Sequence, residues 1–352
     1  MKSFDYVRPV TVREAVAAAA QPGAAYLAAG TNLLDLMKGG VTNPKRIVDI
    51  SHLPDLDRIE DLPDGGVRIG ALVRNADLAN DHDFAQRFPA VAEALLSGAS
   101  AQLRNAATVG GNLMQRTRCA YFYDVASACN KRNPGTGCDA RGGDSRLHAV
   151  LGWSEHCIAT HPSDFCVPLV ALDAVVEIEG GAGRREIPLE TFHRLPGDAP
   201  DRESVLAPGE MIVAVRLPAE AAGFAAHARY LKVRERTSYA FAVVSAAAAL
   251  RIEADVIADA RFALGGVASK PWRSREAERI LIGAPAEAPV FRRAAEVALA
   301  DAKPSGDNAF KIELARRVVV RAFALAAAGT PERLPALPGS PFAAVFGVVD
   351  HA

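Results

Sequence analysis

The order of apolar and polar positions divides the chain into regions of different secondary structure. The first region, residues 1–56, alternates short amphipathic helices with short apolar strands. Thr11, followed three residues later by Glu14, has the pattern of a capping box and predicts the start of a helix. The glycine pair at 39–40 predicts the end of a second helix. This βαβ-like order predicts a small, partly parallel sheet.

Strand patterns dominate the next region, residues 57–222, where the apolar run at 168–180 (PLVALDAVVEIEG) reads as one strand. Residues 223–330 combine long strand patterns with a run of helical ones, which is typical of an α+β domain. The proline-rich end, residues 331–352, is expected to be a tail that lies over a surface. The fold class predicted for the whole chain is α+β.

Composition narrows the class of protein. Hydrophobic residues make up 50% of the 352 residues and charged residues 23%, which is ordinary for a soluble globular protein. The 40 basic residues are balanced by 41 acidic ones, so no nucleic-acid partner is expected. The longest apolar run, residues 239–250, is too short to span a membrane, and no membrane partner is expected.

Two glycine-containing loops have the composition of phosphate-binding turns. One is AAGTNL at 28–33, between an expected strand and helix, and the other is TVGGN at 108–112. Backbone N–H groups at a helix N-terminus can bind a pyrophosphate when no Cβ stands in the way, which Gly30, Gly110 and Gly111 permit. Neither loop is the GxGxxG of a Rossmann domain, and either loop alone could equally be a tight turn.

Taken together and in this order, these stretches resemble a known family. LAAGTNLLDLMK and LRNAATVGGNL are similar to the two FAD loops of the flavin-binding medium subunit of molybdenum hydroxylases, which include xanthine dehydrogenase, aldehyde oxidoreductase and carbon monoxide dehydrogenase. FDYVRPVTVREAV resembles the family's opening, and LAPGEMIVAVRLP the end of its FAD domain. The family commonly has glycine where Ala29 stands, so Ala29 is expected to have an ordinary backbone conformation.

The resemblance implies a fold of the p-cresol methylhydroxylase type, in which two α/β subdomains hold FAD and a smaller α+β domain follows. THPSDFCVPLVALDA is similar to a family stretch whose aspartate approaches the sugar hydroxyls of the flavin, and Asp164 matches it. Lys232 matches a lysine near the isoalloxazine, where a cation would stabilise the anionic reduced flavin. The FAD-binding residues implied by the resemblance are Tyr26, Leu27, Ala28, Ala29, Gly30, Thr31, Asn32, Leu33, Thr108, Gly110, Gly111, Asn112, Asp164 and Lys232.

All five cysteines lie between residues 119 and 166. In most of the family only a few residues separate the second FAD loop from the Ser-Asp stretch, so residues 113–161 are implied to be an insertion in the second subdomain. A subset, notably bacterial aldehyde oxidoreductases, carries a [4Fe-4S] cluster in this subunit, and CNKR-P-G-GC resembles that subset. Four thiolates are what such a cluster requires, and glycines and basic residues suit its negative charge. The expected ligands are Cys119, Cys129, Cys138 and Cys157.

Alternatives to this cluster remain open. His148, His156 and His161 lie nearby and would suit zinc, although the closely spaced cysteine pairs of structural zinc sites are absent. Cys166 is expected to be a buried core thiol, but it could replace one of the four ligands. The basic residues of the insertion could equally form an interface.

A flavin and a cluster in one chain form an electron conduit. The first hypothesis is therefore the middle subunit of a heterotrimeric, molybdenum-dependent aldehyde oxidoreductase. Electrons would pass from a molybdopterin-binding large subunit through a [2Fe-2S] small subunit to FAD and then to an external electron acceptor. Alternatives are the flavin subunit of a reductive aryl-thioester dehydroxylase and a zinc-stapled assembly module. No general acid or base is expected on this chain, and His193 and His227 are expected to be structural.

The expected location depends on the partners. The chain starts without the pattern of a secretory signal, which on its own indicates the cytoplasm. The subset that the chain resembles can be exported as a folded trimer by a twin-arginine signal on the small subunit, so a periplasmic location by co-export is the alternative.

Overall fold

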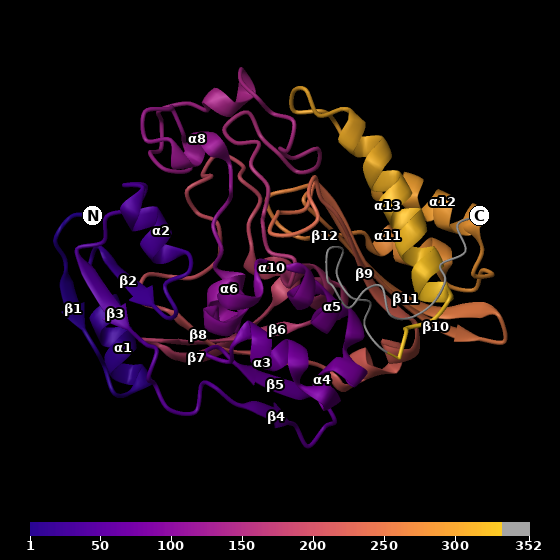
Figure 1. Ribbon diagram of the computed structural model, residues 1–352, viewed down its shortest axis with the longest axis horizontal. Coiled ribbons are helices and arrows are strands. Elements are labelled where there is room, and N and C mark those ends of the chain that lie inside the picture. The colour runs from indigo at the N-terminus through magenta and orange to yellow at the C-terminus, as the bar shows by residue number, and fades with distance from the viewer. Residues whose placement is uncertain (333–352) are drawn as a thin grey trace.

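A computed structural model describes residues 1–332. Residues 333–352, which make up nearly all of the predicted tail at 331–352, lie outside the described residues. Three sheets succeed one another along the chain, and Figure 1 shows them from the N-terminal side to the C-terminal side of the molecule. The α+β fold class is confirmed.

A parallel three-stranded sheet with the order β1-β3-β2 forms the first subdomain, as the βαβ-like pattern predicts. The Thr11 hydroxyl accepts a hydrogen bond from the Glu14 N–H and caps the first helix. The Glu14 carboxylate reaches one residue further back than in a standard capping box, to the Val10 N–H. The elements are β1 (Asp5–Val7), α1 (Val12–Ala19), β2 (Ala24–Leu27), α2 (Leu33–Lys38) and β3 (Arg46–Asp49).

An antiparallel five-stranded sheet with the order β4-β5-β8-β6-β7 forms the centre of the second subdomain. The expectation of one strand over 168–180 was wrong in its first half, because the chain is helical to Ala171 and the strand begins at Val175. A short apolar run that is buried on all sides has no period that separates helix from strand. The elements are β4 (Ile59–Asp61), β5 (Val67–Gly70), α3 (Asn75–Asn80), α4 (His82–Arg87), α5 (Pro89–Ser97), α6 (Ala101–Ala106), α7 (Val109–Leu113), α9 (Cys166–Ala171), β6 (Val175–Gly180), β7 (Gly183–Pro188), α10 (Leu189–Phe192) and β8 (Met211–Leu217).

The C-terminal domain shares a core with the second subdomain. Successive side chains of a strand point to opposite faces, and on β10 the residues Ala246 and Ala248 belong to a core with α13, while Ala247 and Ala249 belong to the core of the second subdomain. Small side chains on both faces allow helices to pack closely on each side. After a 3₁₀ segment (Ala219–His227), the elements are β9 (Ala228–Val233), β10 (Val244–Glu253), β11 (Val256–Gly265), β12 (Trp272–Arg273), α11 (Arg275–Leu281), α12 (Ala288–Ala298) and α13 (Phe310–Ala327).

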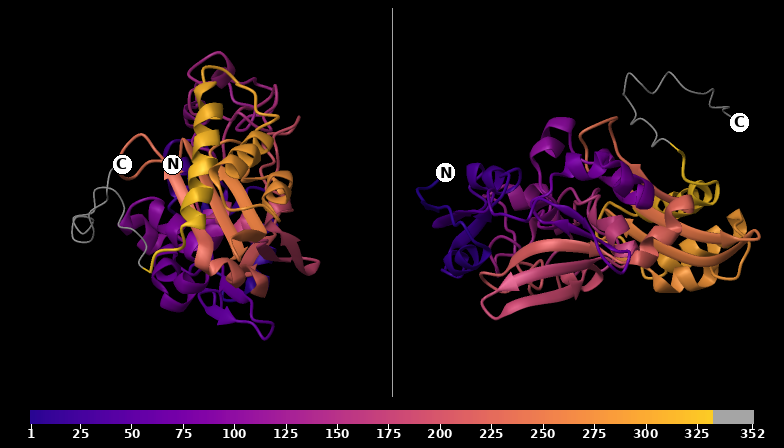
Figure 2. Two further views of the ribbon diagram at one scale, coloured as in Figure 1. Left: turned by 90° about the vertical axis from the view of Figure 1, so that its right-hand side faces the viewer. Right: turned by 90° about the horizontal axis from the view of Figure 1, so that it is seen from below.

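Between α7 and α9 the chain forms a lobe, residues 114–161, with little regular structure beyond α8 (Ala120–Tyr123) and a 3₁₀ turn (Asp139–Arg141). Figure 1 shows it projecting from the second subdomain, with α2 on one side and α13 on the other, and the lobe stands at the top of the left view of Figure 2. The N–H groups of Val150 and Leu151 both donate to the Val267 carbonyl, at 2.9 and 3.0 Å, so the lobe is anchored on the C-terminal domain. In the described residues, no helix combines the length and the apolar character needed to cross a bilayer.

Candidate functional site

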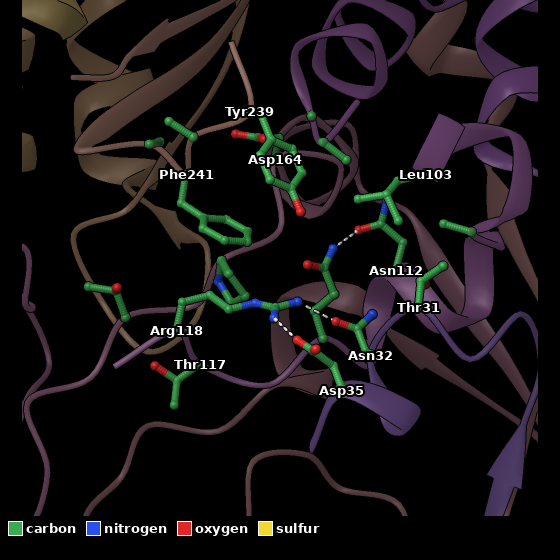
Figure 3. Close-up of a pocket in the computed structure, with 18 of the residues that line it drawn as sticks. Thr31, Asn32, Asp35, Leu103, Asn112, Thr117, Arg118, Asp164, Tyr239 and Phe241 are labelled. Carbon is green, nitrogen blue, oxygen red and sulfur yellow. Dashed lines mark hydrogen bonds and ion pairs between the residues drawn. The ribbon is translucent and has the colours of Figure 1, made fainter. Parts of the chain in front are cut away.

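A cavity of about 930 Å³ lies where both subdomains, the lobe and the C-terminal domain meet. Ligand-binding pockets commonly span roughly 300–1,000 Å³, so this cavity is large enough for an extended cofactor. Its lining includes residues of α2 and the loop before it, of α5, α6 and α7, of the lobe, and of the loop between β9 and β10. Figure 3 shows their side chains converging on the cavity.

The first glycine loop supplies one wall of the cavity. Gly30 has a φ of +75°, a backbone conformation that favours glycine, and a Cβ on it would lie 2.7 Å from the Leu34 side chain and displace it. Ala29 has no positive φ, as expected. Of the eight residues proposed for this loop, Ala29, Gly30, Thr31 and Asn32 line the cavity. Tyr26, Leu27, Ala28 and Leu33 do not belong to the lining, and the Tyr26 hydroxyl donates instead to the Gly209 carbonyl at 2.7 Å.

The second glycine loop builds a helix start that presents Asn112. The Thr108 hydroxyl accepts from the Gly111 N–H at 3.3 Å and caps α7. Gly110 packs on the chain after β5: its N–H donates to the Ala71 carbonyl, and a Cβ would lie 3.0 Å from the Ala71 Cβ. Only Asn112 of the four proposed residues lines the cavity, so Thr108, Gly110 and Gly111 act here by positioning it.

The carboxylate of Asp164 lines the cavity and is held from behind by two side chains of β9. Its Oδ1 accepts from the Tyr230 hydroxyl at 2.5 Å, and its Oδ2 from the Lys232 ammonium at 2.7 Å. Burial, and then the charge of Asp164, raise the pKa of Tyr230 well above its usual value, so the phenol remains a donor. Lys232 itself does not line the cavity, because its ammonium is paired with the Asp164 carboxylate, which does.

Arg118 and Phe241 are lining residues that the sequence reasoning missed. The Arg118 guanidinium, which comes from the lobe, donates to Asn32 of the first loop and to the Tyr123 hydroxyl, and it lies 5.0 Å from the centre of the Phe241 ring (Figure 3). It therefore joins three parts of the chain across the cavity. Its place immediately before Cys119 was the available signal, but its partners are distant in sequence.

The four proposed ligand cysteines come together in the lobe. Cys119, Cys129, Cys138 and Cys157 all line one small cavity, and none of them is in a disulfide. Cys129 and Cys138 face each other across an antiparallel bridge. The glycines of NPGTGC were expected to turn their N–H groups toward a cluster, but those of Gly135 and Gly137 donate to the Asn130 side chain, which closes this turn.

Other backbone N–H groups do face the sulfurs. Burial raises the pKa of the Cys119 thiol to about 11, opposed by hydrogen bonds from the backbone of Phe122 and Tyr121. Burial also raises the pKa of Cys138, opposed by the backbone of Ala140, Ile158 and Arg141, and the pKa of Cys157, opposed first by the charge of Lys131. Amide dipoles and a nearby cation are what a set of metal-bound thiolates requires in a buried site.

The fifth cysteine lies apart from these four. Cys166 is the first residue of α9, is fully buried in the core of the second subdomain, as expected, and does not line the small cavity. Its sulfur and the rings of His161 and His193 offer ligand atoms within 4.8 Å of one another, the only such group of three among the described residues. No three of the four lobe sulfurs lie within 4.8 Å of one another, whereas the ligands of one zinc ion are roughly 3.8 Å apart.

Acidic residues neutralise most of the lobe's positive charge. Glu203, in the segment before β8, pairs with both Arg116 and Lys131, whose side chains lie inside the lobe. Although burial acts to raise it, the charges of Lys131 and Arg116 hold the pKa of Glu203 below its usual value. Arg141 pairs with Glu155 and Arg146 with Glu235. The basic composition is therefore used largely to fasten the lobe.

The two cavities share a wall. Thr117, Cys119 and Tyr121 line both the large cavity and the small one, so one of the four sulfurs lies directly between them. Two groups bound in these cavities would be neighbours.

Comparisons with known proteins find relatives over nearly the whole chain. The family described as FAD binding domain in molybdopterin dehydrogenase matches residues 2–220, and the CO dehydrogenase flavoprotein C-terminal domain matches residues 229–326. The aldehyde oxidoreductase FAD-binding subunit PaoB of Escherichia coli is 49% identical, over 93% of this chain and 99% of its own. The carbon monoxide dehydrogenase medium chain of Hydrogenophaga pseudoflava is 28% identical, over 91% and 95%. A solved carbon monoxide dehydrogenase of that organism superimposes with a TM-score of 0.73 at 27% identity, over 93% of this chain and 98% of its own.

Proposed function

Since this chain belongs to the family of FAD-binding medium subunits of molybdenum hydroxylases, and is thus the flavin subunit of an oxidoreductase, we propose that it also binds a [4Fe-4S] cluster and serves as the electron-transfer subunit of an aldehyde oxidoreductase. FAD occupies the large cavity, and Cys119, Cys129, Cys138 and Cys157 hold the cluster. Flavin exchanges electrons singly or in pairs, which allows one chain to connect carriers of both kinds.

The observation that carries the proposal is the shared wall. Four cysteines that are separated by up to 38 residues of sequence line one cavity, and Cys119 also lines the flavin cavity. A structural zinc site has no reason to adjoin a flavin, whereas two redox groups that exchange electrons must be close. That no three of the four sulfurs lie within 4.8 Å of one another also favours a cube over a single ion.

The reaction and the partners are proposed from the relatives. The extensive identity with an aldehyde oxidoreductase subunit supports an aldehyde substrate, oxidised on a molybdopterin-binding large subunit. A [2Fe-2S] small subunit would deliver the electrons, and an external acceptor would remove them. The described residues of this chain supply binding groups for the cofactors.

Metal and flavin content of the purified chain test the cluster. We expect about four irons and one FAD per chain, and a brown colour that dithionite bleaches. Cys129→Ser should lose the iron, while Cys166→Ala, the matched control in the same part of the chain, should keep it. One zinc and no iron in the wild-type protein, or equal loss of iron in both variants, would contradict the proposed ligand set.

The substrate is tested with the complex. The chain co-purified with its partner subunits should reduce an artificial electron acceptor when an aldehyde is supplied. It should not dehydroxylate an aryl thioester when a reductant is supplied. The opposite preference would assign the complex to reductive dehydroxylation instead.

A further inference from the structure

His148 stands at the wall between the two cavities. Its side chain lines the large cavity, and its Nε2 lies 3.2 Å from the sulfur of Cys119, which lines both. Among the described residues, His148 is the one side chain that hydrogen-bonds the sulfur of any of the four lobe cysteines. The ring therefore contacts the sulfur that lies nearest to the flavin cavity.

Buried polar groups of the C-terminal domain fix the backbone of His148. Its carbonyl accepts from the Lys311 ammonium at 2.8 Å and from the Asn308 amide at 3.1 Å, and both of these side chains are fully buried. Lys311 also donates to the carbonyls of Leu147 and Gly266. Burying an ammonium requires that its hydrogen bonds be made, so this anchor holds the imidazole in one place.

The chemistry of a metal-bound sulfur sets the direction of the hydrogen bond. A cysteine that ligates iron has no thiol proton, so its sulfur can only accept, and the Nε2 of His148 must be the donor. The other ring nitrogen, Nδ1, is buried and has no partner in the protein, which is compatible with a neutral ring whose proton is on Nε2.

We propose that His148 donates a hydrogen bond to the Cys119 sulfur and thereby raises the reduction potential of the cluster on the side that faces the flavin. This inference rests on the cluster of the proposed function. A hydrogen bond to a ligand sulfur withdraws negative charge, and it stabilises the reduced cluster, which carries one more negative charge, more than the oxidised one. His148 acts as a positioning and tuning residue, because it touches a ligand of the cluster and not the cluster itself.

Three substitutions in the full complex test this role. His148→Leu removes the donor, His148→Asn shortens it out of reach of the sulfur, and His148→Gln keeps an N–H near the position of Nε2. The readout is the midpoint potential of the cluster, from a redox titration followed by electron paramagnetic resonance. We expect His148→Leu and His148→Asn each to lower the midpoint potential of the cluster by about 59 mV, which is about a tenfold change in the equilibrium constant for one electron. His148→Gln should recover most of this difference.

The iron content distinguishes a failure of the proposed function from a failure of the proposed role of His148. If the wild-type complex contains no cluster iron, the proposed function fails before the inference is tested. If the wild type and the variants keep their iron but share one potential, the role of His148 is refuted. If His148→Leu loses iron, the midpoint potentials of His148→Asn and His148→Gln are compared instead, and equal potentials refute the role of His148. Because His148 also lines the large cavity, the flavin potential is recorded in the same titration, and the role is judged on the cluster potential alone.

Discussion

The ion pair between Asp164 and Lys232 offers the sharpest test of how the large cavity, the proposed FAD site, is built. Both side chains are buried, with exposed fractions of 8% and 4%, and their charged atoms are 2.7 Å apart. Lys232 has one further acceptor, the Ser97 carbonyl at 3.1 Å, and Asp164 has one further donor, the Tyr230 hydroxyl. Removing either partner therefore leaves a buried charge with a single hydrogen bond.

We expect Lys232→Met and Asp164→Asn each to destabilise the chain by about 3–5 kcal/mol, the usual cost of breaking a buried pair from one side. The double variant Asp164→Asn/Lys232→Met removes both charges at once. Its loss should be smaller than the sum of the two single losses by about 0.5–3 kcal/mol, because neither charge is left alone.

Thermal unfolding followed by circular dichroism measures these losses, since 1 kcal/mol shifts the melting temperature of a chain this size by about 1–2 °C. FAD affinity supplies a second readout. Asp164 lines the cavity, so Asp164→Asn should weaken FAD binding directly, and Lys232→Met should do so through the displaced carboxylate. Strictly additive losses in the double variant would refute the coupling. A flavin potential that changes with Lys232→Met but not with Asp164→Asn would show that the lysine acts on the isoalloxazine itself.

Three further predictions concern the loops and the lobe. Gly110→Ala should lower stability by about 1–3 kcal/mol in thermal unfolding, because the new Cβ meets backbone atoms; Gly142→Ala, with open space around it, is the control and should change little. Because the pKa of Glu203 is lower in the folded chain, its carboxylate stabilises the fold at pH values above 4.5, the value of the unfolded chain. This stabilisation is lost as the pH falls through the folded pKa. Glu203→Gln should therefore reduce the melting temperature at pH 7 and flatten its decline below about pH 4.5, and an unchanged profile would contradict the pairing. Arg118→Met should raise the Kd for FAD about tenfold, about 1.4 kcal/mol, by releasing Asn32, and equal affinity by fluorescence titration would contradict this.

The sequence was informative where the local backbone decides the outcome. The need for glycine at position 30, the ordinary conformation of Ala29 and the cap formed by Thr11 all follow from short-range geometry, and they are present. The strand expected at 168–180 failed because the burial of α9 comes from packing against β10 and β11, which no local pattern reveals.

Contacts between residues far apart in the sequence could not be predicted, for a different reason. Lys232 could be matched to a family position, but its pairing with Asp164 joins residues 68 apart in the chain. Arg118 lies beside a proposed ligand, yet its contacts with Asn32 and Phe241 depend on how three parts of the chain meet. Side-chain identity indicated the chemistry here, and the fold determined which groups face one another.

The C-terminal domain lines the large cavity and anchors the lobe, although it carries neither glycine loop nor any of the four lobe cysteines. Its loop between β9 and β10 brings Tyr239 and Phe241 to the flavin cavity, and its helix α13 brings Lys311 to the backbone of the lobe. Because β10 shares its core with the second subdomain, these contacts are set by packing and not by a flexible tether. A change of packing in that domain, such as Ala248→Val between β10 and α13, would therefore displace groups at the large cavity and in the lobe together. A change confined to one glycine loop would affect only FAD binding.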